Sequence, residues 1–327
     1  MVSKALPLFI LHQLLTRYRR GAARNRGFTL TELLVSMVMS TIIIGTLLYV
    51  VVELLQINRR EEALTQTQQN MQRAIDYVAS DVSEAVFVYA DPEVVADELS
   101  DAPDGDAVLA FWRLDPIDTS GLPDDPEDCT GATAAECSTL KIRQNAYTLV
   151  VYFHQANNGN DIWEGPARIV RYELPKYTNP SNLTNANLAD NRRAGYSDPS
   201  LDDNFADWVS SGDTEGIQAV LTDFVDLDSD PDAAPSCPAG YAGSASVPDS
   251  FYTCVVAGES DEGESEDEDE DPLALTVRNN QGIQIYLRGN ATDGGRGTFV
   301  TFSEAGRLPT LETEVFIRGV IQKQARS

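Results

Sequence analysis

The stretch GFTLTE, residues 27–32, stands directly before an uncharged apolar run, LLVSMVMSTIIIGTLLYVVV, that covers residues 33–52. About twenty residues at roughly 1.5 Å each make a helix about 30 Å long, which is the thickness of the hydrocarbon core of a bilayer. We therefore expect a membrane-spanning helix with Glu32 at its edge. An ionised carboxylate at that depth costs about 2.5 to 3.5 kcal/mol, so Glu32 is predicted to be a functional residue that meets a partner.

The Gly-Phe-Thr-Leu-x-Glu pattern before a long apolar run resembles the cleavage and assembly signature of type IV prepilins and pseudopilins. The resemblance implies that a prepilin peptidase cuts after Gly27 and that Phe28 becomes the N-methylated first residue of the mature chain. It also implies that Glu32 pairs with the terminal amine of a neighbouring subunit, because an amine and a carboxylate in a dry bundle cost less together than apart. The alternative is an ordinary signal anchor with an incidental acid.

Residues 1–27 are predicted to be a basic leader that cleavage removes. They contain six Lys and Arg residues and no acid. Positive charge before a spanning helix holds that end in the cytoplasm, so the remainder is expected in the periplasm and later in a filament or on the cell surface. The apolar segment 5–15 is too short to span, and no small-residue cleavage site follows it. A conventional secretory signal peptide is therefore not expected.

The mature chain is predicted to be strongly acidic. Loss of the six leader charges takes the formal net charge from -27 to -33. Such a surface repels phosphate backbones, so nucleic acid is not an expected partner. Apolar residues make up 42% of the chain, which is enough for the core of one globular domain.

The helical pattern continues past the membrane segment 28–52 into an amphipathic segment, residues 53–90. Apolar residues recur there at helical spacings: Leu64, Met71, Ile75, Val78, Val82 and Val86. No proline occurs between residues 28 and 89. We therefore expect one helix of about sixty residues that ends near Pro92 and packs its apolar stripe on the rest of the chain.

Residues 91–327 are predicted to form a globular β-rich domain. Short apolar runs mark candidate strands at 107–114, 147–154, 167–174, 218–227, 273–277, 282–287, 297–302 and 314–321, and several of them alternate apolar and polar residues. A long helix followed by strands gives an α+β architecture, here a helix packed on an antiparallel β-sheet with long acidic loops. This order is similar to the pilin fold. The closing TEVFIRGV at 313–320 resembles the final strand of the larger minor pseudopilins, the type II secretion J and minor pilin W group.

Four cysteines follow the apolar run. We expect Cys129 to pair with Cys137 in a short loop and Cys237 to pair with Cys254 in a longer one. This local pairing is our choice among three connectivities, and it suits an exported domain that meets an oxidising compartment. No Cys-x-x-Cys occurs, so a metal knuckle or a thioredoxin-like site is disfavoured.

Two acidic segments differ in what they predict. Carboxylates alternate at Asp226, Asp228, Asp230 and Asp232, a spacing that lets one loop converge its oxygens on calcium. The segment lacks the turn glycine and the distal glutamate of an EF-hand, so the alternative is a strand that runs into a solvated acidic turn. Ten acids within residues 259–271 predict a disordered, exposed loop.

The sequence contains no enzyme motif: no Gly-x-Ser-x-Gly, no phosphate-binding glycine loop and no histidine-rich set. His154 lies in an apolar strand, where packing is favoured over general-base chemistry. We expect instead a minor pilin or pseudopilin, with prepilin peptidase, sister pilins and an inner-membrane assembly platform as partners. Loop style and acidity resemble cyanobacterial pseudopilins linked to polysaccharide secretion and gliding motility. The alternatives are a calcium-dependent adhesive or ligand-binding tip pilin and a membrane-anchored enzyme.

Overall fold

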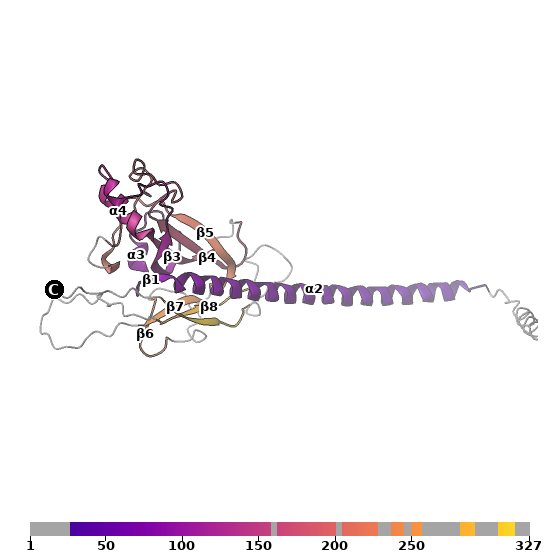
Figure 1. The fold of residues 1–327 in the computed structure, drawn as a ribbon. Helices are drawn as coiled ribbons and strands as arrows, with labels where there is room; N and C mark the ends of the chain where they lie inside the picture. Colours follow the sequence, from indigo (N-terminus) through magenta and orange to yellow (C-terminus); the bar gives the residue numbers. More distant parts are fainter. Residues whose placement is uncertain are drawn as a thin grey trace, which may run out of the picture. The chain divides into compact units, whose positions relative to one another are not determined.

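A computed structural model describes residues 27–157, 162–200, 205–227, 237–244, 250–256, 282–291 and 307–317. The leader up to residue 26, the acidic segment 259–271 and the predicted strands 273–277 and 297–302 lie outside these residues. The chain divides into two compact units, Met1–Arg60 and Glu61–Ser327. Helix α2 (Leu30–Ser83), the long helix in Figure 1, contributes residues to both units.

In the first unit, α2 runs without interruption through the apolar segment. Within the described part of the chain, it is the one helix that is long and apolar enough to cross a membrane. The predicted long N-terminal helix is therefore confirmed.

The predicted end of this helix near Pro92 is wrong. α2 ends at Ser83, and strand β1 (Ala85–Val88) follows it. The sequence AVFVY at 85–89 is rich in β-branched and aromatic side chains, which favour a pleated strand over a helix. β1 pairs with β2, and the N–H of Tyr89 donates to the carbonyl oxygen of Ala110 at 2.9 Å. Val86, the last residue of the predicted helical stripe, therefore lies in a sheet.

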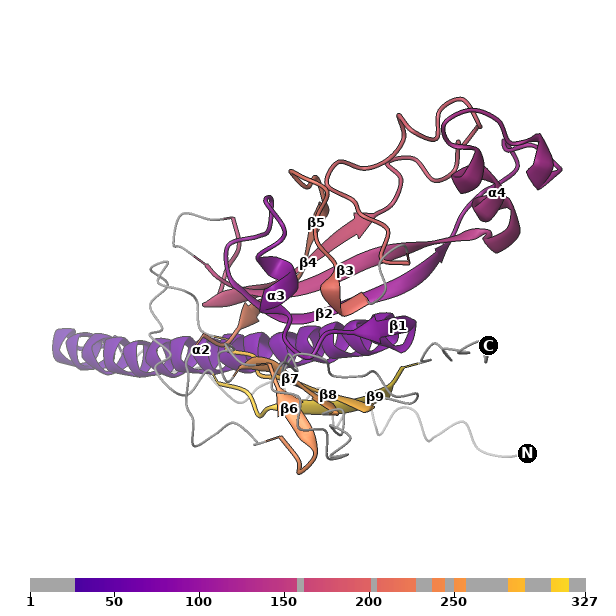
Figure 2. The ribbon, with the colours of Figure 1, turned by 90° about the vertical axis from the view of Figure 1, so that its left-hand side faces the viewer.

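The second unit contains a five-stranded antiparallel sheet in the order β1-β2-β3-β4-β5. After β1 its strands are β2 (Asp106–Pro116), β3 (Asn145–Ala156), β4 (Ala167–Pro175) and β5 (Ile217–Val225) (Figure 2). Each of these four strands overlaps a predicted one. Residues 148–154 of β3 are all buried, so side chains on both faces of this strand are covered.

A second antiparallel sheet has the order β6-β7-β8-β9. Its strands are β6 (Tyr241–Gly243), β7 (Phe251–Val256), β8 (Gly282–Leu287) and β9 (Leu311–Phe316). β8 matches its prediction, and β9 begins before its predicted start. β6 and β7 are not predicted. Their sequences are short and lie beside proline, glycine and cysteine residues, which by themselves indicate loops; only the pairing with neighbouring strands makes them part of a sheet. The α+β arrangement of a long helix and antiparallel strands is confirmed, with the strands divided between two sheets.

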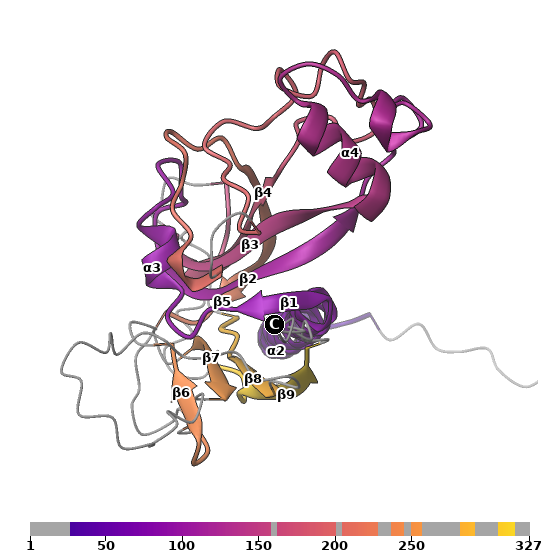
Figure 3. The same ribbon diagram turned by 60° about the vertical axis from the view of Figure 1, so that its left-hand side comes forward.

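The main core of the second unit lies between the two sheets and the final turns of α2 (Figure 3). The helix contributes Met71, Ile75, Val78 and Val82, all buried, so the predicted apolar stripe is confirmed as far as residue 82. The side chains that these helix residues contact in the core come from both sheets. Another apolar cluster, which includes Trp112, covers the opposite face of the first sheet.

A buried ion cluster ties the last turns of α2 to the first sheet. Asp81, which is 7% exposed, accepts a hydrogen bond from the Tyr152 hydroxyl at 2.7 Å and one from Arg171 Nε at 2.8 Å. Arg113 pairs with the same carboxylate, and both arginines also pair with Glu173. Burial raises the pKa of Asp81, but the hydrogen bonds and the two positive charges outweigh it, so this pKa lies below its usual range.

A satellite core surrounds helix α4 (Ala134–Arg143), which the sequence does not predict. The helix stands between acidic and glycine-containing segments that indicate loops. Its end is a left-handed residue, Gln144, with φ 57°. Three shorter helices complete the described elements: α3 (Glu93–Ala96), η1 (Pro126–Asp128) and η2 (Phe205–Asp207).

Candidate processing and assembly site

The start of α2 is closed by a capping box formed by Thr29 and Glu32. The Thr29 hydroxyl accepts the backbone N–H of Glu32 at 3.3 Å, and Glu32 Oε2 accepts the backbone N–H of Thr29 at 3.2 Å. These reciprocal bonds satisfy two backbone donors that the start of a helix leaves open. Thr29 is not among the predicted site residues, although Thr-x-x-Glu before an apolar run is the sequence signal of this cap.

Glu32 has no positively charged partner among the described residues. The side chain is exposed, and its hydrogen bonds come from the backbone and the hydroxyl of Thr29. Because Glu32 lies in the first turn of α2, the helix dipole stabilises its negative charge, but only by about 0.3 to 1 kcal/mol. The described chain therefore holds the carboxylate in place without neutralising it.

Gly27 and Phe28 lie just before this cap. Among the described residues, no atom lies within 4 Å of where a Cβ on Gly27 would stand, and the backbone there has no positive φ. Neither crowding nor backbone conformation therefore requires glycine at this position. Phe28 is 84% exposed, so the bond between the two residues is accessible to a protein that approaches from outside.

The apolar segment of α2 presents a continuous hydrophobic surface in the isolated chain. Every residue from 27 to 62 is exposed. The hydroxyls of Ser36, Thr41 and Thr46 donate to carbonyl oxygens of the preceding turn. Soluble monomers rarely expose an apolar surface of this extent, and internally bonded hydroxyls suit a hydrocarbon medium. The helix therefore indicates membrane anchoring.

Both local disulfides are present in the second unit. Cys129 is bonded to Cys137, with 5.8 Å between their Cα atoms, and Cys237 to Cys254, with 5.6 Å. The first closes a loop of the satellite core, and the second links the segment before β6 to β7. This is the pairing favoured by the sequence, and it staples two loops of the globular unit.

Of the predicted calcium ligands, the structure describes Asp226. The other three carboxylates lie outside the described residues: Asp228, Asp230 and Asp232. Within the described ranges, no group of three or more His, Cys, Asp or Glu side chains is arranged to hold a metal ion. The calcium site therefore stays a prediction.

The described contacts give Asp226 a structural role. Its side chain is 1% exposed, and Oδ2 pairs with Arg288 Nε at 2.9 Å and with Arg307 Nε at 3.2 Å. Asn290 donates to Oδ1 at 2.8 Å. Because Asp226 directly follows β5 and these partners flank β8 and β9, the carboxylate joins the first sheet to the second.

His154 lies in β3 and is buried. Its Nε2 stands 3.1 Å from the carbonyl oxygen of Asp226. Because a carbonyl oxygen only accepts, Nε2 carries the proton and donates it. Burial lowers the pKa of His154 to about 4, so the ring is neutral at pH 7. These contacts give the ring a packing role.

One comparison with known proteins bears on this N-terminal region. Residues 22–48 match the family described as the prokaryotic N-terminal methylation motif. No curated protein and no solved structure matches the chain. The matched residues include the end of the leader, the capping box and the first part of the apolar run. The motif supports a type IV pilin-like protein that is processed by prepilin peptidase and assembles with other pilins in a membrane-associated system.

Proposed function

We propose that this protein is a minor pilin or pseudopilin, a non-catalytic subunit of a type IV pilus-like or secretion filament. Prepilin peptidase removes the leader after Gly27, and Phe28 becomes the methylated N-terminus. The mature subunit waits in the inner membrane and is then taken into a filament by the assembly platform. Such a filament serves secretion or motility, with polysaccharide as one secreted material.

The observation that carries the proposal is the state of Glu32. Its carboxylate lies at the start of a membrane-length apolar helix, is fixed by the capping box, and has no cation beside it among the described residues. A charge in that position is costly in hydrocarbon unless an opposite charge reaches it. The new amine at Phe28 of a neighbouring subunit supplies that charge when the apolar helices pack together.

Two further features support the orientation. The leader carries only positive charge, which favours a cytoplasmic N-terminus. Both disulfides belong to the second unit, and they suit an oxidising compartment such as the periplasm.

The second unit supports a minor rather than a major subunit. It contains two sheets, a satellite core around α4 and long connections between them. The body of a filament repeats one compact subunit many times, and long connections would interfere with such close packing. A subunit present in few copies at or near the filament tip has fewer neighbours, so its long connections do not clash.

The test replaces Glu32 with Gln in the full chain and measures cleavage, methylation and filament incorporation. Glutamine still accepts the N–H of Thr29, so the cap remains and only the charge is lost. Mass spectrometry should show a methylated Phe28 in both the parent protein and the Glu32→Gln variant. Loss of one partner of a buried ion pair costs about 3 to 5 kcal/mol, so incorporation should fall at least a hundredfold.

Glu53→Gln is the matched control, because it removes an exposed carboxylate from the same helix beyond the apolar run. It should assemble normally. Normal assembly of Glu32→Gln would contradict the charge pairing, and an uncut leader in working filaments would contradict the processing step.

A further inference from the structure

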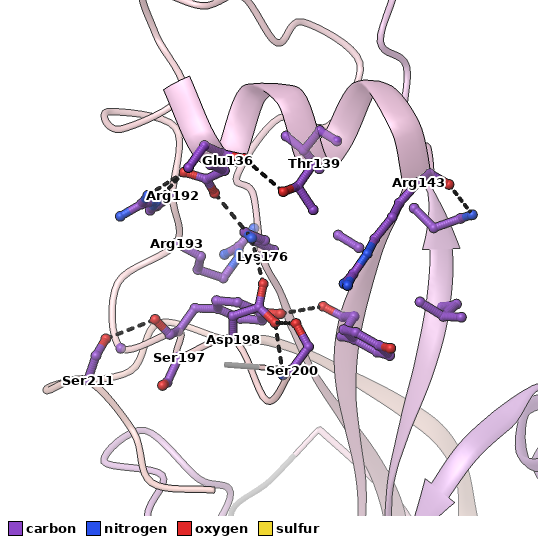
Figure 4. Close-up of a pocket in the computed structure, with 18 of the residues that line it drawn as sticks. Glu136, Thr139, Arg143, Lys176, Arg192, Arg193, Ser197, Asp198, Ser200 and Ser211 are labelled. Carbon is purple, nitrogen blue, oxygen red and sulfur yellow. Dashed lines mark hydrogen bonds and ion pairs between the residues drawn. The ribbon is translucent and has the colours of Figure 1, made fainter. Parts of the chain in front are cut away.

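A cavity of about 880 Å³ lies beside α4 in the second unit (Figure 4). Its walls come from α4, the first residues of β3, the residue after β4 and the segment 192–200. Cavities of about 300 to 1,000 Å³ are typical of sites for small organic ligands. Neither the N-terminal motif nor filament assembly accounts for this cavity.

The charge of the cavity is opposite to that of the whole chain. Its charged lining consists of four cations and two carboxylates: Arg143, Lys176, Arg192, Arg193, Glu136 and Asp198. The chain carries a formal net charge of -27. An excess of positive charge inside such an acidic protein attracts anions to one place on a surface that otherwise repels them.

The two carboxylates are already satisfied from within. Lys176 Nζ stands 3.2 Å from Glu136 and 2.7 Å from Asp198, so it bridges them. The Tyr177 hydroxyl donates to Glu136 at 2.6 Å, and Arg192 pairs with the same carboxylate. Burial raises the pKa of each carboxyl, but these partners outweigh it and hold both pKa values below their usual range. Both acids are therefore ionised at neutral pH and fully engaged.

Two guanidinium groups remain for a ligand. Arg143 makes no side-chain hydrogen bond or ion pair among the described residues, and it extends from the end of α4 into the space in Figure 4. Arg193 donates through Nη1 to the carbonyl oxygen of Glu215 at 2.8 Å, a neutral partner. Its Nε is buried and has no acceptor in the described chain. The cavity thus offers positive charge, on Arg143 and Arg193, that no carboxylate of the described chain compensates.

The rest of the lining is rich in hydroxyl and amide groups rather than in large aliphatic side chains. These groups belong to Thr139, Asn145, Tyr147, Tyr196, Ser197, Ser200 and Ser211. Most of these groups donate within the chain, to acceptors such as the carboxylate of Asp198, and their oxygens keep lone pairs that accept hydrogen bonds from the hydroxyls of a sugar. We propose that this cavity binds an anionic carbohydrate of two or three rings, with Arg143 and Arg193 on its carboxylate groups.

The experiment titrates the full chain in detergent micelles with trigalacturonate, using calorimetry. Maltotriose is the matched neutral sugar, and citrate is the matched carboxylate without a sugar ring. Trigalacturonate should bind at least tenfold tighter than either, and its affinity should fall as salt rises, because the contact is electrostatic. Arg143→Gln should weaken binding about tenfold. Arg73→Gln, an exposed arginine on α2 outside the cavity, should leave binding unchanged.

Arg143 is exposed at the end of its helix, so its replacement should preserve the fold, which the near-ultraviolet circular dichroism of the variant checks. The salt dependence of the unmodified protein tests the proposal independently of any variant. Absence of trigalacturonate binding, equal binding of maltotriose, or a salt-independent affinity would overturn it. Equal binding by citrate would overturn the carbohydrate assignment.

Discussion

Helix α2 carries one carboxylate near each end, and the two are treated in opposite ways. Asp81 is buried, accepts hydrogen bonds from Tyr152 and Arg171, and pairs with Arg113 as well. Glu32 is exposed, and among the described residues its carboxylate accepts hydrogen bonds only from neutral groups of Thr29. The chain neutralises the charge that supports its own fold and leaves the other for a group outside it. On the proposed function, the difference separates a residue for stability, Asp81, from a residue for assembly, Glu32.

The apolar side chains of the same helix show the same division. Ile75 is 1% exposed in the core between the two sheets, whereas Ile43 is 57% exposed in the membrane-length segment. One half of the helix packs its apolar side chains within the chain, and on the proposed function the other half packs against lipid or sister subunits.

The largest effect is expected at Asp81. Asp81→Ala leaves two arginines and the Tyr152 hydroxyl without their shared acceptor, so the second unit should lose about 3 to 5 kcal/mol of unfolding free energy. Urea unfolding in micelles, followed by tryptophan fluorescence, measures this loss, because Trp112 and Trp208 are both buried in the second unit. Asp76→Asn, an exposed change on the same helix, and Glu32→Gln should each stay within about 0.5 kcal/mol of the parent.

The cost of Asp81→Ala should also depend on pH. The pKa of Asp81 is lowered in the folded protein, so its contribution is complete above the unfolded value, about 3.9, and is lost as pH falls further. The difference between parent and variant should therefore shrink as the pH is lowered from 5 toward 2. A constant difference across this range would show that the ion cluster is not its source.

The next effect compares one substitution at two places. Ile75→Ala should cost about 2 to 5 kcal/mol, because it removes buried methyl groups and leaves a cavity in the core. Ile43→Ala removes the same atoms from an exposed position and should leave unfolding of the second unit unchanged. Equal losses would mean that the second unit depends on the membrane segment for its stability.

The smallest effect is expected at the capping box. Thr29→Ala removes the hydroxyl that accepts the N–H of Glu32, which should weaken the start of α2 by about 1 kcal/mol. Amide hydrogen exchange at residues 30–33 should rise about fivefold. Thr29→Ser keeps the hydroxyl and should exchange like the parent. Unchanged exchange in the alanine variant would contradict a role of the cap in solution.

The features that the sequence predicts well are encoded by residues close together in the chain. The GFTLTE stretch and the apolar run sit in one short segment, and the stripe through Ile75 repeats at a helical period. Four strands of the first sheet stand out in the sequence as short apolar or alternating runs. Both disulfides join cysteines close in sequence.

What the sequence does not predict depends on distant partners. The helix ends at Ser83 because residues 85–88 pair with β2 as a strand. The helical spacing of apolar residues carries no information about this strand pairing. Asp81 meets Arg113 and Arg171 only after folding brings three elements together. The cavity beside α4 is likewise lined by residues of α4, by Lys176 directly after β4 and by segment 192–200.

The open space around Gly27 bears on the order in which folding, cleavage and filament growth occur. Because no described atom lies within 4 Å of a Cβ placed on Gly27, the contacts of the described residues form without a cut at this position. On the proposed function, the cell can therefore store finished subunits whose polymerising end is blocked, and hydrolysis of one peptide bond then releases them. Filament growth is in this way scheduled by an enzyme rather than by the rate at which new chains acquire their structure.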